Sequence, residues 1–313
     1  MTTVIEVQGL TRKFGDLLAV DHVDFSVETG EIFGFLGPNG AGKTTTVRML
    51  TGVIEPTEGT ATIQGHDIVK APSPSREHLG IVPEEANVYL DLSVWQNLMF
   101  IAELYGISRR RRIGEGERLL EVFGLAERKH HKARTLSKGL RQRLMLCSAL
   151  ITRPEILFLD EPTIGLDVQS TRLIHKVVSD MNRQGVTVFL TTHDMDEAEE
   201  MCDRVAIINQ GQIAAIDTPD QLQELVRASQ YVEVSFEGLE PQEADLASLP
   251  EVDKVTRKGG HYRLYTDMPG RTAVGLGVFA DRNGLTARDL CTRRPSLEDI
   301  FLHLTEGRSE EVM

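Results

Sequence analysis

The chain has 313 residues, 41% of them apolar and 26% charged, as in ordinary soluble globular proteins, and this length suggests about two domains. Its 47 acidic and 34 basic residues leave a net charge of −13, which argues against a nucleic-acid surface because such a surface needs a basic face. No apolar run approaches the ~18 residues of a transmembrane helix and no signal peptide precedes the first strand, so we expect a cytoplasmic protein.

The first part of the chain predicts three strands followed by a helix. Residues 4–10 and 22–28 alternate apolar and polar side chains, as half-buried strands do. The run IFGFL at 32–36 is apolar throughout, which predicts a buried strand. A helix is predicted over TTTVRMLTGV, and Gly52 would end it.

Between that strand and that helix lies GPNGAGKTT, which fits the pattern G-x-x-x-x-G-K-[ST]. Such a loop directs backbone N–H groups at the phosphates of a nucleotide, and glycines are needed because side chains would block the close approach. Lys43 would reach the β- and γ-phosphates, and Thr44 would offer its hydroxyl to Mg²⁺. The alternative is a glycine turn followed by an exposed lysine. The residues predicted to hold phosphate are Gly37, Pro38, Asn39, Gly40, Ala41, Gly42, Lys43, Thr44 and Thr45.

Between about residues 85 and 135 the pattern becomes helical. Ser93 and Gln96 form a capping-box signature ahead of LMFIAELYG, and RLLEVFGL predicts a second helix. This segment would form a helical subdomain inserted into an α/β core.

Two further apolar runs, 156–159 and 186–192, predict buried strands joined by a helix, and this order implies parallel pairing. Residues 204–216 then predict a hairpin that turns at Gln210 and Gly211. The first run is followed by Asp160, which would hold Mg²⁺ directly or through water, and by Glu161, which would be the general base for the attacking water. Two acids at a strand end also suit a solvated turn.

The composition changes after residue 222. From residue 230 the order strand, helix, strand, strand, helix, strand predicts a small α+β domain of the ferredoxin-like kind, with a final helix capped by Ser296. We therefore expect two domains, 1–222 and 223–313.

Other stretches fall at suggestive places: RKFGD, IVPEE, LSKGLRQRL at 136–144, GLD at 165–167 and LTTHD. With the phosphate loop and ILFLDEP, they make the chain resemble the ATP-binding cassette (ABC) family over about residues 4–222, and the ordered set is far more specific than any one piece. The resemblance implies a P-loop NTPase fold, ATP and Mg²⁺ as ligands, and ATP hydrolysis. It also implies a head-to-tail dimer with a second copy or a homologous subunit, in which the LSGGQ signature of one subunit closes over the γ-phosphate held by the other.

This chain departs from the family's signature, because LSKGL keeps Ser137 and Gly139 but has Lys138 and Leu140 in place of the usual glycine and glutamine. Ser137 and the helix start behind it would still present a hydroxyl and N–H dipoles to phosphate. Lys138 would either add a positive charge near the anion or face solvent.

Four more site residues follow from the resemblance. His193 matches the switch histidine, which contacts the γ-phosphate, and Asp167 matches the D-loop aspartate, which couples the two sites of the dimer. Phe14 lies where the family stacks an aromatic ring, usually a tyrosine, on adenine, although a core phenylalanine is the alternative. Glu84 replaces the glutamine that touches Mg²⁺ and senses the membrane partner, and it is a predicted metal ligand beside Thr44 and Asp160. Its carboxylate would bind Mg²⁺ more strongly than glutamine, but it would repel the γ-phosphate and slow hydrolysis.

Glu84, LSKGL and the closing RRPSLEDIFLHLTEG resemble the cassette subunits of ABC-2-type exporters, which often carry a small C-terminal domain. This resemblance implies a motor subunit at the cytoplasmic face of the membrane, attached through a permease on a separate chain. The permease would dock on residues 85–135, where Met99, Phe100 and Tyr105 would line the groove or belong to the core. The alternative is a soluble cassette ATPase acting on nucleic acid, ribosomes or cluster assembly, against which the acidic charge and the single cassette argue. No nucleic acid is expected as a partner.

Overall fold

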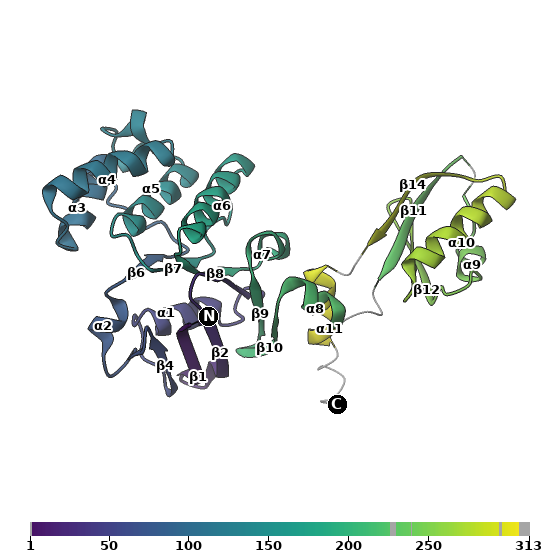
Figure 1. The fold of residues 1–313 in the computed structure, drawn as a ribbon, viewed down its shortest axis with the longest axis horizontal. Helices are drawn as coiled ribbons and strands as arrows, with labels where there is room; N and C mark the ends of the chain where they lie inside the picture. The colour runs from purple at the N-terminus through teal and green to yellow at the C-terminus, as the bar shows by residue number, and fades with distance from the viewer. Residues whose placement is uncertain (1, 226–229, 239, 294–295, 307–313) are drawn as a thin grey trace. The chain divides into compact units, whose positions relative to one another are not determined.

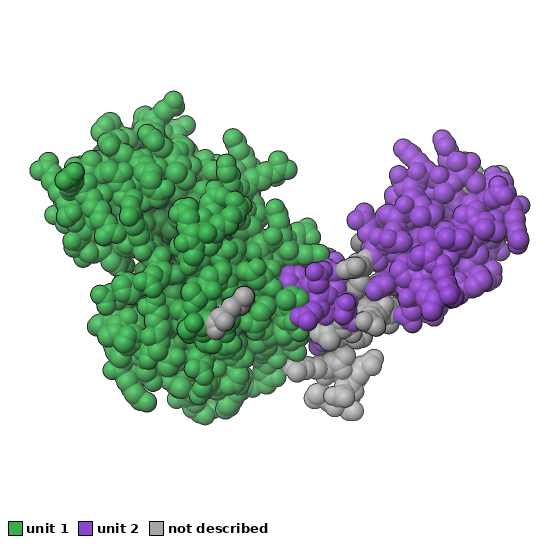
Figure 2. Space-filling view, in the orientation of Figure 1, with its two compact units in different colours: residues 1–218 green, residues 219–313 purple. Residues whose placement is uncertain are grey.

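The structure is a computed structural model that describes residues 2–225, 230–238, 240–293 and 296–306. The chain divides into two compact units, Met1–Thr218 and Pro219–Met313 (Figure 2). The sequence placed this boundary between residues 222 and 223. The difference arises because the short helix α8 (Pro219–Leu225) packs against α11 (Leu297–Glu306) and so belongs to unit 2 (Figure 1).

The first sheet of unit 1 is antiparallel and has the order β2-β1-β4-β5. Its strands are β1 (Thr3–Phe14), β2 (Leu17–Glu28), β4 (Glu58–Ile63) and β5 (His66–Asp67). The two predicted strands are confirmed and extend beyond the alternating segments that predicted them, because the β1–β2 pairing continues to the tight turn after Phe14.

The second sheet of unit 1 has the order β10-β9-β3-β8-β7-β6 and carries the segments of the predicted site. Its strands are β3 (Ile32–Leu36), β6 (Leu79–Val82), β7 (Ile156–Asp160), β8 (Thr187–Thr192), β9 (Arg204–Asn209) and β10 (Gln212–Asp217). All pairs are parallel except β9–β10, which is the predicted hairpin. Every residue of β3, β7 and β8 is buried, as in strands covered on both faces.

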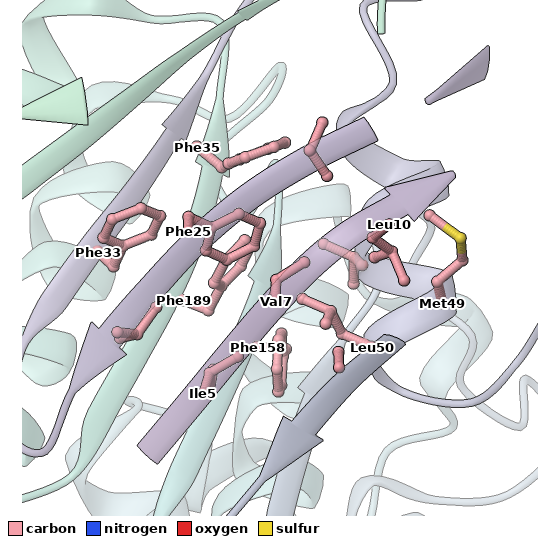
Figure 3. Close-up of a cluster of buried hydrophobic side chains, with 14 of the residues drawn as sticks. Ile5, Val7, Leu10, Phe25, Phe33, Phe35, Met49, Leu50, Phe158 and Phe189 are labelled. Carbon is pink, nitrogen blue, oxygen red and sulfur yellow. The ribbon is translucent and has the colours of Figure 1, made fainter. Parts of the chain in front are cut away.

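An aromatic core joins the two sheets (Figure 3). The ring of Phe25 on β2 stacks on Phe33 of β3 with 5.5 Å between centroids, and Phe189 of β8 lies 5.3 Å from Phe158 of β7. Because such cores are close-packed, the strands are held at fixed positions. The loops that follow the carboxyl ends of β3, β7 and β8 therefore start from rigid supports.

The helices of unit 1 fall into two groups. Those that follow sheet strands are α1 (Lys43–Leu50), α2 (Pro72–Arg76), α6 (Val168–Arg183) and α7 (Met195–Met201). The predicted helical subdomain, about residues 85–135, contains α3 (Val94–Leu104), α4 (Arg109–Val122) and the short 3₁₀ turns Ala126–Arg128 and Ala133–Thr135. The next helix, α5 (Lys138–Leu150), begins beyond these bounds and contacts α3 and α4. Figure 1 shows α3, α4 and α5 gathered together, and the capping box of Ser93 and Gln96 is confirmed at the start of α3. None of the described helices is long and apolar enough to span a membrane.

Unit 2 contains a four-stranded antiparallel sheet with the order β12-β13-β11-β14. Its elements are β11 (Tyr231–Glu237), α9 (Glu243–Ala247), β12 (Lys254–Lys258), β13 (His261–Tyr265), α10 (Pro269–Arg282) and β14 (Thr286–Arg293). Leu246 of α9 and Leu276 of α10 pack with the sheet in one core. This is the βαββαβ order expected from the sequence. Ser296 caps α11, since its hydroxyl accepts the N–H of Asp299.

Candidate nucleotide site

The phosphate loop connects β3 to α1 and has the form that its glycines predict. A Cβ atom on Gly37 would lie 2.2 Å from the carbonyl oxygen of Ile208, and one on Gly42, whose φ is +110°, would lie 2.6 Å from that of Ala19. Both positions therefore need glycine. Residues 38–40 form the exposed tip of the loop, Ala41 is buried, and residues 44 and 45 are half-buried in the first turn of α1. The amino end of α1 thus begins where the loop ends, as in sites that hold phosphate.

Lys43 does not point into solvent, so the alternative of an exposed lysine is wrong. Its ammonium is buried and donates to the carbonyl oxygens of Gly37 at 2.6 Å and Pro38 at 3.2 Å. It also lies 2.9 Å from Oε1 of Glu161, which is buried as well. Because an unpaired charge is costly to bury, each of the two groups compensates the other.

The two predicted carboxylates occupy different surroundings. Oδ1 of Asp160 accepts hydrogen bonds from the hydroxyls of Thr44 at 3.2 Å and Thr191 at 2.6 Å. Glu161 has a φ of +50°, and its N–H donates to the carbonyl and hydroxyl oxygens of Thr191, each at 3.1 Å. A non-glycine residue in this left-handed region costs about 1–3 kcal/mol, so the surrounding structure must hold it there. Neither acid is in a solvated turn.

His193 follows β8 and reaches the same point from the neighbouring strand. Its Nδ1 lies 2.7 Å from Oε2 of Glu161. The carboxylate of Glu161 therefore lies between the ammonium of Lys43 and the imidazole of His193. These three groups come from the segments that follow β3, β7 and β8 at one edge of the sheet. Sequence reasoning predicted all three residues but missed Thr191, whose only signal was the pair of threonines at the end of β8.

The LSKGL stretch lies at the start of α5, where the hydroxyl of Ser137 caps the helix by accepting the N–H of Leu140 at 3.3 Å. Lys138 is exposed, and its ammonium donates to the carbonyl oxygen of Ile164 at 2.7 Å. A Cβ atom on Gly139 would lie 2.7 Å from the hydroxyl of Ser170, which explains why this position needs glycine.

Asp167 caps α6 by accepting the N–H of Ser170 at 2.9 Å and its hydroxyl at 3.0 Å. Both hydrogen bonds lower the pKa of the Asp167 carboxyl group, and the one from the N–H has the larger effect. Among the described residues, no hydrogen bond joins Ser137, Gly139 or Asp167 to the phosphate loop within this chain.

Phe14 and Glu84 are both exposed. The ring of Phe14 at the end of β1 is 45% exposed, so it is no core residue, and the Arg12 guanidinium lies 4.6 Å from its centroid. Glu84 follows β6, and no described hydrogen bond or ion pair joins it to Thr44 or Asp160.

The residues at this edge of the sheet suit a magnesium nucleotide. The oxygens of Thr44 and Asp160 are the hard ligands that Mg²⁺ prefers, and the glycines at 37 and 42 let the loop pack closely against the carbonyl oxygens of Ile208 and Ala19. A parallel sheet with a phosphate loop after β3 and two carboxylates after β7 defines the class of P-loop ATPases.

Comparisons with known proteins place the chain within that class. The family described as ABC transporter matches residues 20–164. The chain is 46% identical over 220 residues to the Probable multidrug ABC transporter ATP-binding protein YbhF of Escherichia coli K12, covering 70% of this chain but only 38% of that protein. It is 33% identical over 309 residues to the linearmycin resistance ATP-binding protein LnrL of Bacillus subtilis, covering 98% and 99%. It is 36% identical over 305 residues to the Nod factor export ATP-binding protein I of Cupriavidus metallidurans, covering 97% and 98%.

A solved structure of an ATP-binding subunit of an ABC transporter superposes with a TM-score of 0.66 at 29% identity, over 71% of this chain and 92% of that one. The chain belongs to the family of ABC transporter ATP-binding proteins, whose members hydrolyse ATP. The predicted fold of the ATPase core and the predicted activity are thereby confirmed. The relatives do not support the alternative of an ATPase that acts on nucleic acid, ribosomes or cluster assembly.

Proposed function

We propose that this chain is the ATP-hydrolysing motor subunit of an ABC exporter, which works as a head-to-tail dimer and drives a permease on a separate chain. The observation that carries the ATPase part is the convergence of Lys43, Glu161 and His193, with 2.9 Å and 2.7 Å between their charged or polar atoms. The exporter part is supported by the relatives, whose names refer to drug resistance and Nod factor export.

In this proposal the phosphates of ATP replace the carboxylate of Glu161 as the ion-pair partner of Lys43. Gly37 to Thr45 surround the phosphates with backbone N–H groups, and the ammonium of Lys43 turns from Glu161 to the β- and γ-phosphates. Mg²⁺ neutralises phosphate charge when it is bound, and Thr44 and Asp160 hold it. The released carboxylate of Glu161 then accepts a proton from the attacking water, and His193 orients Glu161 and contacts the γ-phosphate.

The remaining predicted residues serve contacts beyond the phosphates. Phe14 is exposed and its ring offers a face on which adenine can stack. Ser137 and Gly139 complete the site of a second subunit, to which Asp167 couples them, whereas Lys138 holds the loop at Ile164. Such a division of labour agrees with the lack of hydrogen bonds from Ser137, Gly139 and Asp167 to the phosphate loop among the described residues.

A groove of about 170 Å³ in unit 1 is our proposed docking place for the permease. Ile101 and Tyr105 of α3 line it, together with Pro83 and Asn87 of the segment that carries Glu84. Tyr105 is 59% and Phe100 39% exposed, whereas Met99 is half-buried, with its Cε beside Gly116 of α4. A coupling helix in this groove would contact the segment with Glu84 directly and would hold the chain at the cytoplasmic face of the membrane.

The substitution Glu161→Gln tests the ATPase proposal. It removes the general base, and it also removes the charge that binds Lys43 before ATP arrives. We expect hydrolysis to fall by at least about 100-fold and ATP to bind up to about 10-fold more tightly, with dimers accumulating in ATP. Phosphate release, calorimetry and light scattering measure these effects, and Lys43→Ala is the control that should lose ATP binding. Hydrolysis near the wild-type rate would show that Glu161 is not the base.

A further inference from the structure

A second buried glutamate lies across a cavity from the first. The cavity has a volume of about 450 Å³, and Glu161 and His193 line one part of it. Another part is lined by Glu197 of α7, His175 of α6 and Thr163 of the loop after β7. Glu197 is 4% exposed, and its Oε1 accepts the hydroxyl of Thr163 at 2.8 Å and faces Nε2 of His175 at 2.8 Å.

His175 compensates the charge of Glu197. Its hydrogen bond with Glu197 raises the pKa of the imidazole, which favours the charged form beside a carboxylate that is otherwise expensive to bury. The other charged groups that face this histidine are Glu200, whose Oε2 lies 3.7 Å from Nδ1, and Asp194 at the start of α7, while Arg172 lines the same cavity. The pair of His175 and Glu197 thus joins α6 to α7.

Thr163 connects this pair to the catalytic loop, because it follows Glu161 by two residues. The loop is a turn in which Ile164 donates its N–H to the carbonyl of Glu161 at 3.3 Å and Leu166 donates to that of Thr163 at 3.1 Å. On the strand side, Thr191 holds the left-handed backbone of Glu161. On the loop side, the hydroxyl of Thr163 donates to Glu197 and so ties the turn to α7, while Lys138 ties it to α5 at Ile164.

Glu197 also connects the loop to the switch histidine. Asp194, the residue after His193, caps α7 and accepts the N–H of Glu197 at 3.1 Å. A displacement of α7 therefore moves both His193 and the carboxylate that holds Thr163.

We propose that Thr163, Glu197 and His175 form a positioning triad that fixes Glu161 and His193 in the geometry for water activation. None of the three touches the phosphate loop in the described hydrogen bonds, so the triad acts on the chemical step and leaves ATP binding alone. The inference rests on the proposed role of Glu161 as general base.

The test compares Thr163→Val, which removes the hydroxyl at similar shape, with Thr163→Ser, which keeps it. Because a misplaced catalytic group costs up to about 100-fold, we expect kcat of Thr163→Val to fall about 10- to 100-fold with KM for ATP within about 2-fold of wild type. Thr163→Ser should recover most of kcat. In Thr163→Val/Glu197→Ala the two losses should be less than additive, because each substitution alone breaks the same hydrogen bond between Thr163 and Glu197.

A Thr163→Val protein with wild-type kcat, or a Thr163→Ser protein as slow as Thr163→Val, would overturn the triad. Should Thr163→Val fail to fold, His175→Gln takes its place and must also lower kcat at unchanged KM. Measuring Glu161→Gln in parallel separates the two proposals. If Glu161→Gln abolishes hydrolysis and Thr163→Val does not change it, the triad alone is wrong; if Glu161→Gln hydrolyses ATP normally, the general-base role is wrong.

Discussion

Lys43 and Glu161 illustrate how a nucleotide site manages two buried charges before its ligand arrives. Each is 5% exposed, and each has the other as an ion-pair partner at 2.9 Å. In the proposed mechanism incoming phosphate would replace one anion with another beside Lys43, so the ammonium would remain paired throughout. The carboxylate of Glu161 would then be freed when water must be activated, which would link ATP binding to the availability of the base.

His175 gives the site a dependence on pH that can be measured through stability. Its hydrogen bond with Glu197 raises its pKa above the unfolded value of about 6.5, so the folded state binds this proton more tightly. The resulting stability is fully present below about pH 6.5 and is lost as pH rises through the raised folded pKa. We expect the difference in unfolding free energy between wild type and His175→Gln to shrink as pH rises. Urea titrations at several pH values check this, and a difference that is constant with pH would contradict it.

The elements that the sequence predicts best are those with a strong local signal. Continuous apolar runs specify β3, β7 and β8, and the capping box specifies the start of α3. Two elements were not predicted. The helix α7 has seven mostly polar residues and is held by the cap of Asp194, and β6 is only four residues long. Such short elements form because the sheet and its loops provide partners, and partners are not visible in a local pattern.

The candidate site was likewise predicted as a set of residues and not as a set of contacts. Motif spacing places Asp160 and His193 at strand ends and Lys43 at the start of the helix that follows β3, and parallel pairing brings these segments together. The pairing of Lys43 with Glu161 and the contact of Thr163 with Glu197 depend on side-chain directions set by tertiary packing. No spacing in the sequence contains that information.

Lys138 ties the signature helix to the loop before Asp167. Its ammonium donates to Ile164, and a Cβ on Gly165 would lie 2.8 Å from it, so glycine leaves the space that the lysine fills. We expect Lys138→Met to lower the unfolding free energy by about 1 kcal/mol, the usual value of a hydrogen bond, with KM for ATP unchanged. Lys138→Arg should restore stability. Urea unfolding and steady-state kinetics decide the matter: a raised KM at unchanged stability would mean that Lys138 serves the anion.

Both units lie within the part of the chain that is similar in sequence to LnrL. The similarity to LnrL covers 309 residues and therefore reaches through unit 1 into unit 2, whereas the similarity to YbhF covers only 70% of the chain. Unit 2 has a core of its own around Leu276, which indicates that it is an independently packed module. The motor residues named above all lie in unit 1.

The proposal that this ATPase drives a membrane permease is tested by isolating the tagged chain from its own detergent-solubilised membranes. Tyr105→Glu places a charge in the proposed docking groove, and Val53→Glu places one on an exposed side chain outside it. We predict that a polytopic membrane protein co-purifies in stoichiometric amount with wild type and Val53→Glu and is lost from Tyr105→Glu, while all three proteins hydrolyse ATP. A wild-type protein that carries no membrane partner, or that carries ribosomes or nucleic acid in its place, would contradict the claim.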